Sequence, residues 1–144
     1  MASQLKVDTI TGVTTAGSIS VTGEGNSTTT NLQQGLAKAW ANVTNATPTI
    51  NDSFNIASIT DNGTGDHTLN FTNAMGNANY AYPADVKYNA TSTAVFSAGG
   101  VDSSSINQAT SGVRINTIYV TPSSSRTDYD SNMQFYVVVH GDLA

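Results

Sequence analysis

The first 25 residues of the chain can form β-strands but hold too few large apolar side chains to build a core. Apolar residues alternate with polar ones near residues 5–7 and 19–21, the period-two pattern of a strand with one apolar face. Two short strands cannot bury enough surface to be stable alone, so this arm (residues 1–29) needs another copy or a larger surface to lie against. The apolar residues expected to anchor the arm during assembly are Leu5, Val7, Ile10, Ile19 and Val21.

The composition favours β structure over helix. Ser, Thr and Asn occupy 52 of the 144 positions, whereas only 10% of the residues are charged, against about 25% in an ordinary globular domain. Thr favours strands, and Asn and Gly favour turns. The chain has one Glu, five Leu and three Met, so strong helix formers are scarce. We therefore expect a mainly β protein.

Charge and cysteine content exclude several function classes. The net charge is −5 and the five Lys and Arg residues are scattered singly, so nucleic-acid binding and binding to an anionic membrane are not expected. The absence of Cys excludes disulfides and thiolate metal sites. No apolar run reaches the length of a membrane span, and the N-terminus lacks the apolar run of a signal peptide. We expect synthesis in the cytoplasm without a signal peptide and without membrane insertion.

A single helical candidate covers residues 30–44. Its larger apolar residues recur at spacings of three and four, the pattern of one helix face, and Thr30 or Asn31 could cap its start. So short a helix must pack on something to be stable. Its apolar face could join the core or form a seam between copies, and the pattern favours neither. The residues of this face are Leu32, Leu36, Trp40 and Val43.

Residues 45–144 read as about seven short strands divided by turns. The segment 53–60 alternates, Asp61-Asn62-Gly63 follows, and 66–72 alternates again, which is a strong hairpin signal. Apolar residues on both faces of 133–140 indicate a central strand that is covered on each side. We expect a β-sandwich or jelly-roll-like domain over 45–144, preceded by the extended arm and the short helix.

The sequence offers no convincing catalytic or metal site. Without Cys, a nucleophile–base pair would need His67 or His140, and neither sits in a pattern with an orienting group. The segment 61–66 faintly resembles a calcium loop but has Leu69 where the bidentate Glu belongs, so it fits a turn better. We expect no enzyme activity, no catalytic residue, no cofactor and no metal ligand.

The six tyrosines could pack in a core or interface, or stack on sugar rings. Packing is the general expectation for tyrosine, with the hydroxyl reaching the rim. Tyr129 is the best candidate for a surface contact, because nothing in its polar loop would bury it. The residues expected to share that contact are Asp128 and Asp130.

Two segments resemble structural proteins of tailed phages. The opening LKVDTITG…GSISVTGEG (5–25) resembles the N-terminal segment of such proteins, especially in phages of marine bacteria. The block GLAKAWANV…DSFNIASITDNGTGDHTLNFTNAMGNANY (35–80) is similar to a module of phage tail fibres and related appendages. The resemblance covers about half of the chain continuously and identifies a module rather than an activity.

The resemblance implies a virion protein. It would be a homotrimer attached to other tail or capsid proteins by its arm, with the β domain outward. Contact of this domain with a host surface glycan is a further hypothesis. Relatives often carry the module on a long shaft that this chain lacks, so a short fibre or appendage is expected. Two alternatives stay open: a capsid decoration (cement) protein that stabilises the head, and a stand-alone glycan-binding, lectin-like module.

Overall fold

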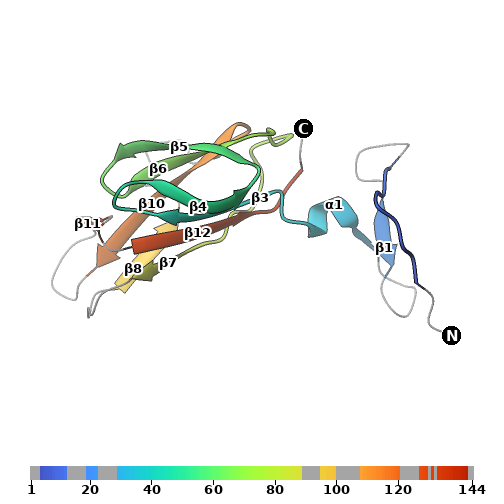
Figure 1. Cartoon of the computed structure of the whole chain (residues 1–144), viewed down its shortest axis with the longest axis horizontal. Helices are drawn as coiled ribbons and strands as arrows, with labels where there is room; N and C mark the ends of the chain where they lie inside the picture. The colour runs from blue at the N-terminus through green and yellow to red at the C-terminus, as the bar shows by residue number, and fades with distance from the viewer. Residues whose placement is uncertain are drawn as a thin grey trace. The chain divides into compact units, whose positions relative to one another are not determined.

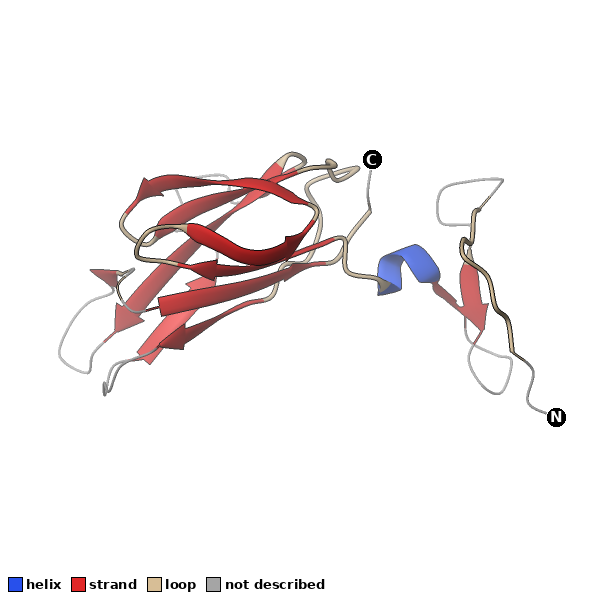
Figure 2. Ribbon diagram, viewed as in Figure 1, coloured by secondary structure: helices blue, strands red, loops and turns tan. Residues whose placement is uncertain are grey.

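The computed structural model describes most of the chain. In the described part, the regular secondary structure is strand except for one short helix (Figure 2). The described residues are 4–12, 19–22, 29–88, 95–99, 108–120, 127–129, 131 and 133–142. The chain divides into two compact units, Met1–Leu36 and Ala37–Ala144. The mainly β fold expected from the composition is confirmed.

The first unit contains a small hairpin and one helical turn. Strands β1 (Ser20–Thr22) and β2 (Thr29–Asn31) pair antiparallel. The hairpin is extended by a hydrogen bond from the Leu32 N–H to the Ile19 carbonyl, 2.8 Å long. The helix α1 covers only Leu32–Gly35.

The second unit is a sandwich of two antiparallel sheets (Figure 1). The first sheet has four strands in the order β4-β3-β12-β7. Strand β12 pairs with β3 on one side and with β7 on the other, so the predicted central position of this strand is confirmed. The expected covering of both its faces is wrong, because Tyr136 and Val138 on the outer face are partly exposed. The bounds are β3 (Ala39–Thr44), β4 (Thr49–Phe54), β7 (Ala84–Tyr88) and β12 (Met133–Val139).

The second sheet is built around β10. This strand pairs with β6 and then β11 along one edge, and with β9 and β8 along the other, while β5 pairs with β6. The hairpin expected around residues 61–65 is present as β5 and β6. The bounds are β5 (Ile56–Gly63), β6 (Asp66–Phe71), β8 (Val95–Gly99), β9 (Gln108–Ala109), β10 (Gly112–Val120) and β11 (Thr127–Asp128).

The core lies between the inner faces of the two sheets. Alternate residues of β3, β6 and β12 are buried, as the period of two in a strand requires. The non-alternating part of the core comes from the loop between β6 and β7, which contributes Met75 and Tyr80. The other buried apolar residues of the cluster are Ala39, Ala41, Val43, Leu69, Phe71, Val113, Ile115, Phe135, Val137 and Val139.

Tyr80 is buried in this core, and its hydroxyl is hydrogen-bonded to backbone carbonyls. The hydroxyl donates to the carbonyls of Gly112 and Ala109, at 2.7 and 3.1 Å, and the ring packs edge-on against Phe71. Burial raises the pKa of Tyr80 to about 12, because the phenolate would lose its solvation there. This tyrosine therefore acts as a neutral core residue whose polar end is satisfied by backbone.

The helix predicted over residues 30–44 is wrong. Only Leu32–Gly35 is helical, as α1, while Thr30 and Asn31 belong to β2 and residues 39–44 form β3, in the middle of a sheet. The apolar positions fit a helical spacing, but Ala39, Ala41 and Val43 also alternate, and pairing with β4 and β12 selects the strand. The sandwich therefore includes β3 and begins before the expected boundary at residue 45.

The segment 53–60, expected as one strand, is interrupted at Asn55. There the chain leaves the four-stranded sheet at the end of β4 and enters the second sheet at β5. Asn55 has a φ of 58°, a left-handed conformation that Asn tolerates better than most residues. Its side chain stabilises the connection between the two sheets with two hydrogen bonds. The amide donates to the Lys38 carbonyl at 3.0 Å, and Oδ1 accepts from the Asn73 N–H at 2.7 Å.

Replacing Gly65 by Ala should destabilise the sandwich. Gly65 has a φ of +65°, and an added Cβ would lie 2.5 Å from the Thr117 carbonyl oxygen and 2.7 Å from the Tyr129 nitrogen. Overpacking against backbone costs about 1–3 kcal/mol, so the urea midpoint of Gly65→Ala should fall clearly below that of the wild type. Gly35→Ala is the control, since an added Cβ there meets nothing within 4 Å. Equal midpoints for wild type and Gly65→Ala would contradict this packing.

Candidate functional site

The expected anchoring residues of the arm do not form a core in the single chain. Leu5, Val7, Ile10 and Val21 are each between 52% and 81% exposed, and Ile19 is half-buried. Side chains of this size are costly to leave in water, at about 1.5–3 kcal/mol each. The arm therefore presents apolar side chains that another surface could bury.

The four residues of the expected helical seam do not share a face. Val43 is fully buried in the core, while Trp40, three residues earlier on β3, lies on the opposite face of the strand and is half-buried. Leu36 is 52% exposed and Leu32 is half-buried. The geometry therefore assigns Val43 to the core and leaves Trp40 and Leu36 toward solvent.

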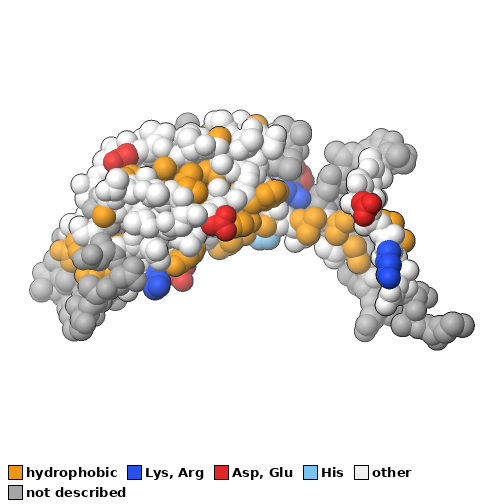
Figure 3. Space-filling view, in the orientation of Figure 1, with side chains coloured by type: hydrophobic (Ala, Val, Ile, Leu, Met, Phe, Trp, Pro, Cys, Tyr) orange, Lys and Arg blue, Asp and Glu red, His pale blue; other side chains and the backbone are white. Residues whose placement is uncertain are grey.

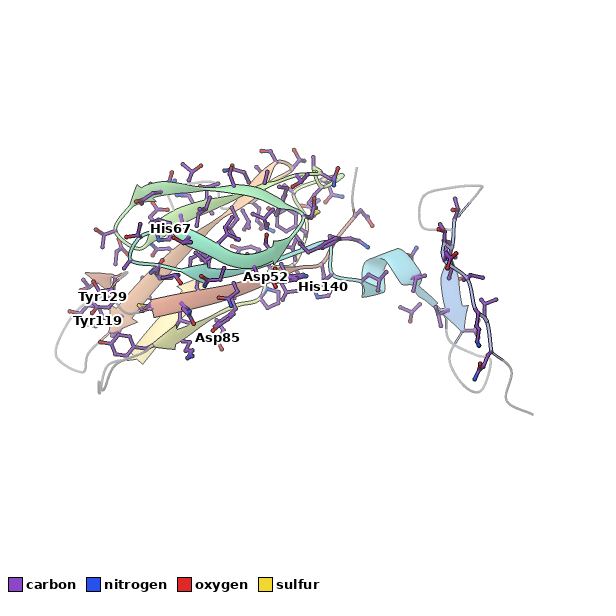
Figure 4. The ribbon with its side chains drawn as sticks, in the orientation of Figure 1. Asp52, His67, Asp85, Tyr119, Tyr129 and His140 are labelled. Atoms are coloured by element: carbon purple, nitrogen blue, oxygen red, sulfur yellow. The ribbon has the colours of Figure 1, made fainter. Side chains whose placement is uncertain are left out.

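Tyr129 is better held than its loop sequence suggests. Its ring centre lies 5.0 Å from that of Tyr119 and 6.3 Å from that of Tyr88, and Figure 4 shows Tyr119 and Tyr129 beside each other. Its carbonyl accepts from Thr117 Oγ1 and Asn45 Nδ2, at 2.7 and 3.2 Å. The premise that nothing would bury Tyr129 is wrong, because these contacts half-bury it.

Of the two residues expected beside Tyr129, one can be placed. Asp128 is exposed at the end of β11, and Asp130 lies outside the described residues. The polar side chains beneath this loop, Asn45 and Thr117, are both fully buried and bonded to each other at 2.7 Å. The buried Asn45 and Thr117 thus hold the backbone of this loop at Tyr129. The Tyr129 side chain is half-buried, and Asp128 is exposed.

The acidic residues of the turn between β5 and β6 are bonded to protein donors. Asp61 Oδ1 accepts from the Gly63 N–H at 3.0 Å, as expected for a turn. Asp66 forms a bidentate ion pair with Arg114. The arginine Nε donates to Asp66 Oδ1 at 2.7 Å, and Nη2 donates to Oδ2. These hydrogen bonds, with the guanidinium charge, hold the pKa of Asp66 below its ordinary value, although partial burial acts the other way.

The two histidines have different environments (Figure 4). His67 is fully buried, and its ring lies parallel to that of Phe135 with centres 5.9 Å apart. Its Nδ1 is 3.7 Å from Asp61 Oδ1. His140 follows β12, is half-buried, and exchanges two backbone hydrogen bonds of 2.9 Å with Ala81. His67 therefore packs the two sheets together, and His140 extends the pairing of β12.

The outer face of the second sheet carries a network of hydroxyls and amides on β5 and β6. Asn70 Nδ2 donates to Ser58 Oγ and Thr60 Oγ1, at 3.1 and 3.0 Å. Asn62 Nδ2 donates to Thr68 Oγ1 at 2.9 Å. These side chains satisfy one another across the strands, so this face is polar and already bonded.

The outer face of the four-stranded sheet has an apolar row instead. Trp40 lies directly opposite Phe54 on β4 and Val138 on β12, and directly opposed residues project from the same face of a sheet. Since the neighbours Ala39 and Ala41 point into the core, this row points outward. Phe54 is 52% exposed, and the other two residues are half-buried. We call these three residues the apolar row.

A second row beside it carries hydrogen-bonding groups across all four strands. Asn42 on β3 is opposite Asp52 on β4 and Tyr136 on β12, and Tyr136 is opposite Asp85 on β7. Both aspartates are exposed, and Figure 4 labels them on the two outer strands of the sheet. Figure 3 shows apolar and acidic side chains next to each other on the visible side of this unit. We call these four residues the polar row.

The two aspartates also close the edges of the sheet. Asp52 Oδ1 accepts from the Ser53 N–H at 2.9 Å, and Asp85 Oδ1 accepts from the Val86 N–H at 2.8 Å. Both residues lie on edge strands, where unpaired N–H groups would otherwise be open to another chain. Each carboxylate keeps its second oxygen for a further donor.

Sequence reasoning missed this surface because it assigned residues 30–44 to a helix. In a helix, Trp40 and Asn42 point in different directions, and neither would align with Phe54 or Tyr136. The signal that could have revealed the face is the alternation of Trp40, Asn42 and Thr44 with small apolar residues. Register with β4 and β12 then brings the two rows together.

Within the described residues, no cluster of three or more His, Cys, Asp or Glu side chains could hold a metal ion. Of the helices in that same part of the chain, none is long and apolar enough to cross a membrane. The candidate contact surfaces of the described residues are thus the exposed arm side chains, the Tyr129 loop, and the apolar and polar rows.

The ion pair of Asp66 should make part of the stability pH-dependent. A carboxyl whose folded pKa is lowered contributes stability above its ordinary pKa, and this contribution is lost as the pH falls through the lowered value. Asp66→Asn should therefore be less stable than wild type at neutral pH, with the difference shrinking below the ordinary pKa of 3.8. Urea unfolding from pH 7 to pH 2 measures this, and Arg114→Gln should behave alike. Parallel curves would contradict it.

Comparisons of the chain with protein-family models, with curated proteins and with solved structures found no match. A function must therefore be inferred from the surfaces that the described residues expose, and kinship with phage appendage proteins stays a prediction from the sequence.

Proposed function

We propose that this chain is a structural, non-enzymatic protein of a tailed-phage particle. In this proposal it is a short trimeric fibre or appendage on the tail or head. Residues 1–36 attach it to its own copies and to other particle proteins, and the β-sandwich is the domain that meets the host surface. The protein would be made in the host cytoplasm and end in the virion.

The exposure of the arm is the observation that carries the proposal. Four large apolar side chains among the described residues of the arm are more than half exposed, whereas the sandwich has a core of its own, formed by residues buried between its two sheets. A sandwich that is complete by itself does not need the arm for its core. An arm with exposed apolar side chains is instead suited to contacts with other chains.

A structural role is favoured over catalysis by the surroundings of the ionisable groups. His67 is enclosed between the sheets, and Asp66 is engaged by Arg114. A general base needs access to the proton that it removes, and His67 lacks such access. The half-exposed His140 lies at a strand end, where its backbone is paired with Ala81.

The native mass of the full-length protein tests the attachment role of the arm. We expect a trimer for the wild type and a monomer for the variant Leu5→Ser/Val7→Ser/Ile10→Ser, since burying each of these side chains is worth about 1.5–3 kcal/mol. The control Gln4→Ser/Lys6→Ser/Thr9→Ser changes polar neighbours and should remain trimeric. Light scattering measures all three. A wild-type monomer, or a trimer in the triple apolar variant, would overturn the role of the arm.

Location in a particle is tested with an antibody against the sandwich. We expect gold-labelled antibody to decorate purified particles of the phage whose genome encodes the chain, at discrete sites on the tail or head. Label confined to the tail would identify a fibre, and even label over the head would identify a decoration protein. Particles without label, together with absence of the chain from their protein content by mass spectrometry, would overturn the virion assignment.

A further inference from the structure

We propose that the outer face of the four-stranded sheet binds a neutral polysaccharide. Sugar rings would pack on the apolar row, and their hydroxyls would donate hydrogen bonds to the carboxylates of the polar row. The inference deepens the proposed function, on which it rests, by naming the chemistry of the host surface that the sandwich would meet. The residues that would carry the contact are Trp40, Phe54 and Val138, with Asn42, Asp52, Tyr136 and Asp85.

The contrast between the two outer faces points to this sheet. On the second sheet, Asn70 and Asn62 use their amides to bond the hydroxyls of neighbouring strands. On the four-stranded sheet, Asn51 bonds Asn42 and Thr44 in the same way. What distinguishes this sheet is that aromatic and aliphatic side chains of three adjacent strands form a continuous row in register. Phe54, at the end of that row, is more than half exposed. Ligand sites combine apolar surface with a few placed polar groups, and this is the composition of the two rows.

The dimensions of the face suit a chain-like ligand. The polar row crosses four strands, from Asp52 on β4 to Asp85 on β7. Neighbouring strands lie about 4.7–4.9 Å apart, so the row is about 14–15 Å long. An oligosaccharide lying across the strands would contact both rows along its length. A polar row of this length suits an extended ligand better than a compact one.

Charge selects the kind of polysaccharide. The polar row carries two carboxylates, Asp52 and Asp85, each with one oxygen engaged by a backbone N–H. The remaining oxygens accept hydrogen bonds from hydroxyls, while they repel an acidic polymer. The Tyr136 hydroxyl, which donates to Gln134 Oε1 at 3.1 Å, can accept a further bond. A neutral polysaccharide therefore fits this row, and a polyuronate does not.

The same charges argue against a second copy on this face. Two copies meeting through the four-stranded sheet would each bring two exposed carboxylates into the interface, and among the described residues of that face the exposed cation is Lys87, opposite Gln134. Like charges brought together in an interface cost several kcal/mol. The neutral glycan is thus the occupant that the observations favour.

Gel electrophoresis of the full-length native protein tests the inference. The gels contain galactan, mannan or dextran as neutral probes, or polygalacturonate as the acidic match to galactan. We expect at least one neutral probe to retard the wild type and polygalacturonate not to. Trp40→Ala and Phe54→Ser should each weaken the retardation about tenfold, and Asp85→Asn should weaken it less, because its amide oxygen still accepts.

Matched controls come from the second sheet. Val120→Ser removes an apolar side chain that is 37% exposed there, and Asp61→Asn removes an exposed carboxylate. Both should leave retardation unchanged. Thermal melting verifies that each variant is folded, and the edge position of Phe54 makes it the safer of the two aromatic tests. Loss of retardation in the controls as well would assign binding to the overall surface and overturn the proposal.

Native mass measured on the same samples separates this inference from the proposed function. A trimer that none of the neutral probes retards would overturn the glycan face and leave the structural role in place. A fall in native mass for Trp40→Ala and Phe54→Ser would identify the face as a contact between copies, and would also overturn the glycan proposal. If the wild-type protein is monomeric and a neutral probe still retards it, the result supports the glycan face and counts against the trimer.

Discussion

Burial of the two inner sheet faces against each other is the interaction on which the rest of the structure depends. The long central strands β10 and β12 place Ile115 and Phe135 inside, and His67 adds a ring that stacks on Phe135. Because successive residues of a strand point to opposite faces, burying one set fixes the other set outward. The position of Trp40 on the surface is therefore determined by the burial of Ala39 and Ala41 on the same strand.

Local patterns predicted the strands whose signal is complete within the segment. The β5–β6 hairpin follows from alternation and from turn residues, and β12 follows from the apolar residues on both of its faces. The failures lie where distant pairing decides. At residues 39–44 both periods were present, and partners far along the chain selected the strand. At Asn55 the alternation continues while the chain changes sheets. The candidate site could not be predicted, because its rows exist only once the register of β3, β4 and β12 is known.

Asn and Thr side chains bond one another on both outer faces of the sandwich. On β5 and β6, Asn62 and Asn70 bond hydroxyls of the neighbouring strand. On the four-stranded sheet, Asn51 bonds Asn42 and Thr44 in the same way. Hydroxyls and amides thus take the place of charged groups on both faces of a chain with few charged residues, and the apolar row is what distinguishes the four-stranded sheet.

Asp52 on β4 and Asp85 on β7 affect how closely spaced copies of the protein would contact one another. If many copies stand close together on one particle, the unpaired N–H and C=O groups of an edge strand can pair with the edge strand of a neighbouring copy. Here the backbone donors of Ser53 and Val86 are occupied by the carboxylates of Asp52 and Asp85. Neighbouring copies would then meet through side chains instead of backbone ladders, and an assembly of them would stop at a finite size rather than grow into a fibril.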